Sequence, residues 1–167
     1  MTRSFSPWLL SNNLNGNCIG GTANGDKQYV LSVLQGMIPS GDAKTDKRIQ
    51  KAIDRLEKSL TVDWWTGPMA LDPKDGKHVF DEERKVVHEL SKKELAGNVT
   101  AQNLIQTIVA VDRSLAQYQI DNPSPGVTAK DIAKANDEMA KGDADAGAGK
   151  PESAIEHYKQ AWDKVAK

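Results

Sequence analysis

The residues of this chain that could do chemistry are few, and they are spread along the sequence. There is one cysteine, Cys18, and there are three histidines, at His78, His88 and His157. Cys18 lies among Gly and Asn residues, with no neighbouring histidine or carboxylate that would generate a thiolate, so the context does not favour a nucleophile. A single cysteine cannot form an intramolecular disulfide. We therefore interpret Cys18 as a bystander thiol, or as one whose partner lies in a longer parent chain.

A metal site is the first chemistry to consider around the histidines. His78 and Glu82 are one helical turn apart and could share a metal ion. A structural zinc site needs four ligands and a catalytic one needs three, however, and no further His or Cys stands at a matching offset. His88 lies four residues from both Arg84 and Lys92, and these cations repel a metal. The sequence therefore predicts no metal and no cofactor, and a surface pair between His78 and Glu82.

Several acidic residues surround Gly76 and suggest calcium at first sight. An EF-hand loop needs oxygen ligands at positions 1, 3 and 5. Counting from Asp72, however, Lys74 and Gly76 occupy the second and third of these positions, so the pattern fails. We interpret Asp72 and Asp75 as parts of a solvated turn.

Patterns that are typical of catalysis are not recognisable. The sequence has no Ser–His–acid set, no pair of carboxylates in distinct environments, and no glycine-rich phosphate loop with its flanking strand. Asp112 and Arg113 interrupt the most apolar segment, and Asp112 falls near its buried face. We favour a salt bridge or a capping role for this pair. The sequence therefore predicts a protein that is not an enzyme.

Trp64 and Trp65 are conspicuous, because half of the chain's four tryptophans stand side by side in a segment with prolines and glycines. Two interpretations are open. One ring could plug the space between two helical hairpins, since a fully exposed pair would leave an apolar patch. Alternatively, the rings form a platform that stacks on a carbohydrate or peptide, with Asp63 and Asp72 as polar neighbours. Because adjacent loop residues point in different directions, we expect one ring to be buried and the other to be partly open.

The composition describes the protein that must position these residues. The 167 residues are 38% hydrophobic, 27% charged and 5% aromatic, which is typical of a helical domain with a sizeable core. The net charge of −1 provides no field that would hold nucleic acid. No apolar run approaches the roughly 20 residues of a membrane span, so membrane insertion is not expected. The first residues do not have the pattern of an intact signal peptide.

Apolar residues at helical spacing indicate a helical protein, and no alternating run is long enough to indicate a strand. We therefore predict an all-α fold, an antiparallel bundle of about five or six helices joined as hairpins. The clearest apolar stripe consists of Ile49, Ala52, Ile53, Leu56 and Leu60. The expected helices begin at Asp26, at Asp42 or Thr45, at Lys77, at Thr100, at Thr128 and at Pro151, and the third is expected to end at Gly97.

Residues 1–25 differ from the rest of the chain, because they are rich in Gly and Asn and almost uncharged. This composition predicts an irregular N-terminal arm, whose apolar residues 8–10 either anchor it to the helices or belong to a disordered segment. The helical domain is expected to span residues 26–167. We divide it into a four-helix part, 26–122, and a terminal helical hairpin, 127–167.

The terminal hairpin resembles a single tetratricopeptide (TPR) repeat. One repeat cannot form a peptide-binding array, since such arrays need about three or more repeats to bury their faces. Asp145 and Ala146 also stand where aromatic residues are common in that family. The resemblance therefore implies a TPR-like terminal hairpin and no binding groove. The residues that carry it are Gly142, Ala144, Gly149, Ala154, Ile155, Tyr158 and Ala161.

A wider resemblance covers roughly residues 26–167. The segments "DKRIQKAIDRLEKSL", "LDPKDGKHVFDEERKVV", "IVAVDRSLAQYQI" and "AIEHYKQAWDKV" resemble a helical C-terminal region of large secreted or surface proteins of bacteria and archaea. The resemblance implies a non-catalytic structural or interaction module, extracellular or at the cell surface, and it supplies no site residues. A cytoplasmic location is the alternative. The implied partners are other protein domains or subunits and, if Trp64 and Trp65 form a platform, glycans or peptides.

Overall fold

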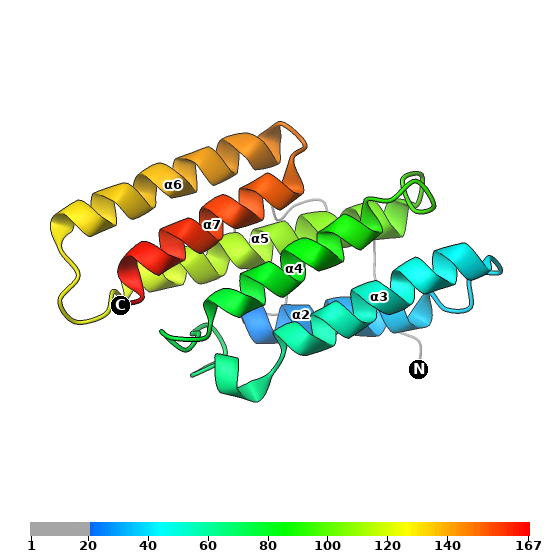
Figure 1. The fold of residues 1–167 in the computed structure, drawn as a ribbon, viewed down its shortest axis with the longest axis horizontal. Helices are drawn as coiled ribbons and strands as arrows, with labels where there is room; N and C mark the ends of the chain where they lie inside the picture. The colour runs from blue at the N-terminus through cyan, green and yellow to red at the C-terminus, as the bar shows by residue number, and fades with distance from the viewer. Residues whose placement is uncertain (1–20) are drawn as a thin grey trace.

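The computed structural model describes residues 21–167, and this part of the chain is all-α, as predicted (Figure 1). Most of the expected irregular arm, including Cys18 and residues 8–10, lies outside the described residues. Between α3 and α4 the chain also forms a short 3-10 helix, η1 (Val62–Trp64). The α-helices are α2 (Ala23–Gly36), α3 (Ala43–Ser59), α4 (Lys77–Leu90), α5 (Val99–Asp121), α6 (Ala129–Gly147) and α7 (Pro151–Val165).

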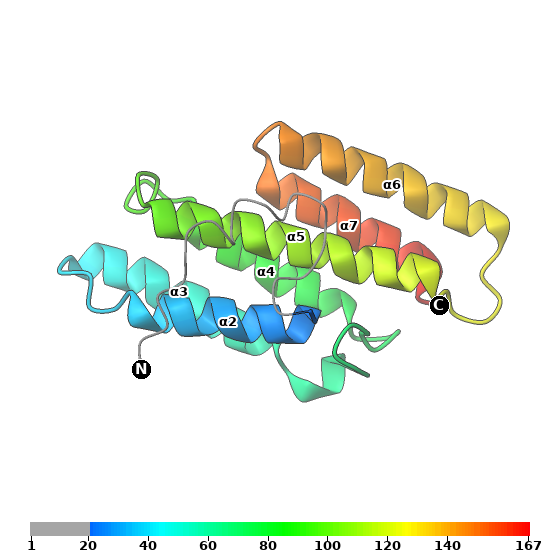
Figure 2. The ribbon, with the colours of Figure 1, turned by 180° about the vertical axis from the view of Figure 1, so that it is seen from behind.

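The first four of these helices form a bundle, and the last two form a hairpin against one side of it. α2 packs on α3 and α5, and α4 packs on the same two helices, so the four close into a ring. α7 lies along α4 and α5, and α6 is the outermost helix, as both views show (Figures 1 and 2). α4 and α5 therefore have the bundle interior on one side and the hairpin on the other.

Four helix starts agree with the sequence pattern, and one of them is the start of α4 at Lys77. The Asp42 carboxylate accepts a hydrogen bond from the Thr45 backbone N–H at 2.8 Å and caps α3. Thr128 and Asp131 form a reciprocal capping box at the start of α6. Pro151 occupies the first turn of α7, where a missing N–H group leaves no hydrogen bond unmade.

Two other helix starts differ from the prediction. α2 begins at Ala23 and is capped by Thr22, whose hydroxyl accepts a hydrogen bond from the Gly25 N–H group. Asp26, the expected cap, is buried inside this helix. α5 is capped by Asn98 rather than Thr100, because the Asn98 side chain accepts a hydrogen bond from the backbone N–H of Ala101, three residues further on.

The end of α4 also differs from the prediction. The helix ends at Leu90, seven residues before Gly97. The residues between them form turns, and these turns place Leu95 in the core with no exposed surface. The free energy gained by burying Leu95 thus favours these turns over the continued helix that the pattern suggested.

The core follows the predicted stripe of α3, except at its last position. Ile49, Ala52, Ile53 and Leu56 are buried, whereas Leu60 is half-buried. Phe80 of α4 and Trp162 of α7 place their ring centroids 6.0 Å apart and so connect the bundle with the hairpin.

The two helices of the hairpin approach each other closely at one glycine. A Cβ atom at Gly142 of α6 would lie 2.5 Å from a ring carbon of Tyr158, so only glycine allows this separation. The Tyr158 hydroxyl donates to Asp143 at 2.8 Å, and Arg113 of α5 donates to both oxygens of the same carboxylate. One carboxylate therefore connects α5, α6 and α7.

Candidate functional site: two ionic clusters on opposite sides of α4

The tryptophan segment is a compact loop between α3 and α4. Trp64 ends η1, and Trp65 pairs with Leu71 in an isolated antiparallel bridge. The Asp72 backbone N–H donates to the Trp64 carbonyl at 2.9 Å. The Asp72 carboxylate accepts from two backbone N–H groups of the following turn, which agrees with its interpretation as a turn residue. Asp63 is exposed.

The two tryptophan rings have different neighbours, although both are half-buried. The Trp65 indole N–H donates to the Ser59 carbonyl at 2.9 Å. The Lys27 ammonium lies 5.0 Å from the centroid of the Trp65 ring. The Trp64 ring stacks at a tilt on His78, with centroids 5.4 Å apart. Trp65 therefore faces the bundle interior and Trp64 faces the outside of α4. Neither ring is the fully buried plug that we expected.

Below Trp65 lies a cluster of three buried charged side chains, the interior cluster. It consists of Lys27 from α2, Glu83 from α4 and Asp112 from α5, with exposed fractions of 1%, 0% and 0%. The Lys27 Nζ contacts Glu83 Oε1 directly and lies 3.3 Å from Asp112 Oδ1. Of the two roles expected for Asp112, a salt bridge or a cap, the structure shows a contact with a cation, and the cluster joins three helices of the bundle.

The interior cluster has one cationic group for two carboxyl groups. Burial and the neighbouring Glu83 charge raise the pKa of Asp112 well above its ordinary value, and Lys27 only partly opposes them. Asp112 Oδ2 and Glu83 Oε2 have no hydrogen-bond donor among the described residues. A proton on Asp112 that is donated to Glu83 satisfies both oxygens and makes the cluster neutral. We therefore assign Asp112 as a carboxylic acid beside a Lys27–Glu83 ion pair.

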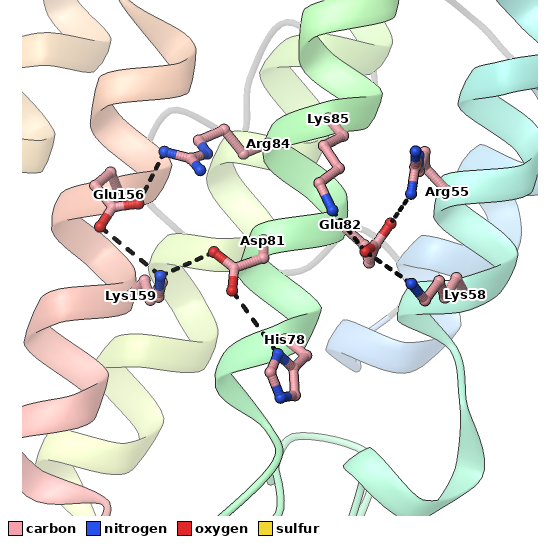
Figure 3. A network of polar contacts seen from close by, with 9 residues as sticks. All are labelled: Arg55, Lys58, His78, Asp81, Glu82, Arg84, Lys85, Glu156 and Lys159. Atoms are coloured by element: carbon pink, nitrogen blue, oxygen red, sulfur yellow. Dashed lines mark hydrogen bonds and ion pairs between the residues drawn. The ribbon is translucent and has the colours of Figure 1, made fainter.

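The opposite, outer side of α4 carries a second cluster, the outer network, which is drawn in Figure 3. At its centre Glu82 accepts from Lys85 at 2.8 Å and from Arg55 and Lys58 of α3 at 3.2 Å each. Although partial burial opposes the effect, these hydrogen bonds lower the pKa of Glu82. Next to it, an open hollow of about 380 Å³ is lined by Lys51, Asp54, Arg55, Lys58 and Glu89.

The outer network continues from α4 to α7. Lys159 of α7 lies 2.8 Å from Asp81 and 3.8 Å from Glu156, and Arg84 donates to Glu156 at 3.1 Å (Figure 3). His78 faces Asp81 at 3.9 Å. The expected pair of His78 with Glu82 is therefore wrong by one residue, because Glu82 turns towards the cations of α3.

The other two histidines also face carboxylates across helices. His88 of α4 contacts Glu152 of α7 at 3.1 Å. His157 of α7 contacts Glu138 of α6 at 2.7 Å and lies 3.6 Å from Asp145. Within residues 21–167 no group of three or more His, Cys, Asp or Glu side chains is arranged to hold a metal ion.

Two members of the interior cluster, Lys27 and Glu83, escaped the sequence reasoning. Glu83 stands four residues after Val79 and three before Val86, which is a position in the apolar stripe of α4. Lys27 stands three residues before Val30 in the same way on α2. A charged residue at a position where the helical spacing of an apolar stripe calls for an apolar one indicates a buried charge, and this signal was present in the sequence.

Comparisons with known proteins identify no family for this chain. No family model matches the chain, and neither a curated protein nor a solved structure matches it. Among the described helices, none is both long and apolar enough to cross a membrane.

Proposed function

We propose that this chain is a non-catalytic helical module that supports or contacts other domains of a secreted or cell-surface protein. The observation that carries the proposal is the outer network, whose charged side chains pair with one another across α3, α4 and α7. Such pairs fix the relative position of helices. A catalytic site instead directs its titratable groups into a cavity where a substrate can reach them.

The proposed location and the proposed TPR-like character of the hairpin rest on sequence resemblance. The resemblance to helical regions of large surface proteins supports the extracellular location. Small residues where α6 meets α7, such as Gly142 and Ala154, support the likeness of the hairpin to one TPR repeat. The proposed partners are neighbouring domains or subunits.

The proposal is tested by assaying the purified chain against a broad panel of hydrolase and transferase substrates. We expect no turnover above that of a matched preparation of an unrelated helical protein. Turnover that co-purifies with the chain and disappears with a substitution in the open hollow beside the outer network, such as Lys51→Met, would overturn the non-catalytic assignment.

A second candidate function is binding of a carbohydrate or peptide at the tryptophan loop. It is favoured by the exposure of η1, where Val62 is 82% exposed beside the exposed Asp63 and the half-buried Trp64. The arrangement of rings predicts that Trp64, rather than Trp65, would contact the ligand. Calorimetric titration with glycan and peptide libraries should then show binding that Trp64→Ala abolishes and Trp65→Phe retains. If no ligand binds, this candidate is rejected and the structural module stands.

A further inference from the structure

We propose that Lys27 and Asp112 form an intramolecular amide cross-link in the folded protein, with Glu83 transferring the protons. This inference is independent of the proposed function, because it concerns a reaction of the chain with itself. It rests on the geometry of the interior cluster, on its isolation from water, and on the protonation states that this isolation favours.

The two groups that would react are held together by the fold. Lys27 Nζ lies 3.3 Å from an oxygen of the Asp112 carboxyl group, although 85 positions separate the residues in sequence. The amine and the carboxyl group are thus in hydrogen-bond contact, and holding two reacting groups side by side removes much of the entropic barrier that separate molecules would face. Because α2 and α5 are packed against each other, the pair cannot diffuse apart.

An amine and a carboxylic acid ordinarily do not condense in water, because the acid gives its proton to the amine and both become unreactive ions. Burial reverses this preference, since a low-dielectric interior penalises the charged forms. Asp112 has no exposed surface and its pKa is raised, so its carbonyl carbon is available as a neutral electrophile. Glu83 contacts the Lys27 amine and is the base that can remove its extra proton.

The reaction balances without an added reagent. Glu83 accepts one proton from the Lys27 ammonium, and the neutral amine attacks Cγ of protonated Asp112 to form a C–N bond. Glu83 then carries a proton from the nitrogen to the leaving hydroxyl group, the C–O bond breaks, and one water molecule departs. The products are an amide, water and a protonated Glu83, so neither net charge nor oxidation state changes.

The surroundings favour the amide over the ions. The Trp65 ring lies over the Lys27 ammonium at 5.0 Å and closes the cluster towards the loop. Amide formation removes a buried ion pair, whose desolvation is costly, and replaces it by a neutral group.

The chain contains a matched pair that should not react. Lys159 and Asp81 are closer, at 2.8 Å, but their side chains are 23% and 27% exposed. Both side chains are therefore in contact with water, where an amine and a carboxyl group do not condense. The contrast between these two Lys–Asp pairs isolates burial as the cause of reactivity.

The experiment is intact-mass measurement of the full chain under denaturing conditions, followed by tryptic mapping. We expect a mass lower by one water than the sequence requires. We also expect a branched peptide in which Lys27 is joined to Asp112 and is no longer cleaved by trypsin. A succinimide would also lose one water, but it would leave Lys27 cleavable. The Lys159 and Asp81 peptides should remain separate.

Glu83→Gln preserves the shape of the cluster and removes the base, so this variant should retain the full mass for much longer. Circular dichroism confirms that it is folded. If Glu83→Gln does not fold, the measured mass of the wild-type protein alone decides whether the cross-link forms. Full mass and free Lys27 in the folded, aged protein would overturn the proposal. A link from Lys27 to Glu83, or undiminished cross-linking in Glu83→Gln, would overturn the assigned roles.

Discussion

Glu82 and Glu83 are neighbours on α4, yet they face opposite environments. Glu82 pairs with three cationic side chains that are partly exposed to solvent, and the pKa of Glu82 is lowered. Glu83 shares one lysine with a second carboxyl group in the closed interior, and there the pKa of Asp112 is raised. One step along a helix therefore separates an ionised carboxylate from a site that needs an extra proton. The number of cations and the access of water, rather than the residue type, determine this difference.

The two tryptophans extend the same comparison. Trp65 covers the interior cluster, whereas Trp64 stacks on His78 at the margin of the outer network. Without the Trp65 ring, water would reach the interior cluster. The outer network is already in contact with water, so loss of the Trp64 ring changes its hydration little. The consequences of substitution should accordingly differ between the two sides of α4.

The largest effect is expected from Lys27→Met. Removing the cation of the interior cluster, which also removes the amine of the proposed cross-link, leaves two buried carboxyl groups without compensation. This should lower the free energy of unfolding by about 3–5 kcal/mol or more. Urea denaturation followed by circular dichroism measures this change. Lys58→Met on the outer network is the control and should cost about 1 kcal/mol or less, because its side chain is 53% exposed. Equal losses in the two variants would contradict the distinction between the clusters.

The tryptophans should also differ in their contribution to stability. Trp65→Ala removes the ring over Lys27 and the hydrogen bond to Ser59, and we expect a loss of about 2–3 kcal/mol for this half-buried ring. Trp64→Ala should cost less, about 1–2 kcal/mol, since this ring packs only in part against the core and its aromatic contact is with the exposed His78. Thermal unfolding of both variants provides the measurement. A larger loss for Trp64→Ala would mean that the two roles are reversed.

Acid should weaken the outer network at Glu82. Because the folded-state pKa of Glu82 is lowered, its stabilisation is present above the unfolded-state value near 4.5 and is lost as the pH falls through the folded-state value. Glu82→Gln should therefore cost about 1–2 kcal/mol at neutral pH. The difference between this variant and the wild type should decrease as the pH falls below the unfolded-state value. Denaturation across that range tests the sign, and a difference that grows in acid would refute it.

The smallest effect is expected from salt. Raising the ionic strength from about 0.1 M to 1 M shortens the screening length from about 10 Å to 3 Å. The cost of Lys58→Met, at most about 1 kcal/mol, should then become undetectable. The cost of Lys27→Met should be retained, since no solvent reaches that cluster. Salt titration of the two unfolding midpoints compares them directly.

Much of the fold could be predicted because it depends on local patterns. The apolar stripe of α3, the capping box at Thr128 and the proline at the start of α7 each act over a few residues. The end of α4 could not be predicted in this way. It is determined by Leu95, which reaches the core from a turn, and tertiary burial of this kind leaves no periodic signal.

The candidate site was only partly predictable for a related reason. Asp112 was conspicuous because it interrupts the most apolar helix, and its predicted burial is confirmed. Lys27 and Glu83 lie in segments rich in charge, where a long side chain at the edge of an apolar stripe usually extends to solvent. Their partnership depends on the packing of α2, α4 and α5, which pattern reasoning on single helices does not provide.

The contact between Gly142 and the Tyr158 ring constrains how the length of α6 can change. An α-helix turns by about 100° per residue, so inserting or deleting one residue between Thr128 and Gly142 would rotate the two ends of α6 against each other. The helix could then keep either its capped start or the glycine under the ring, but not both. With the glycine displaced, a side chain would stand where a Cβ atom already lies 2.5 Å from Tyr158. Natural variation in the length of the hairpin should therefore be confined to its loops, at 122–127 and 148–150, while α6 keeps a constant number of residues.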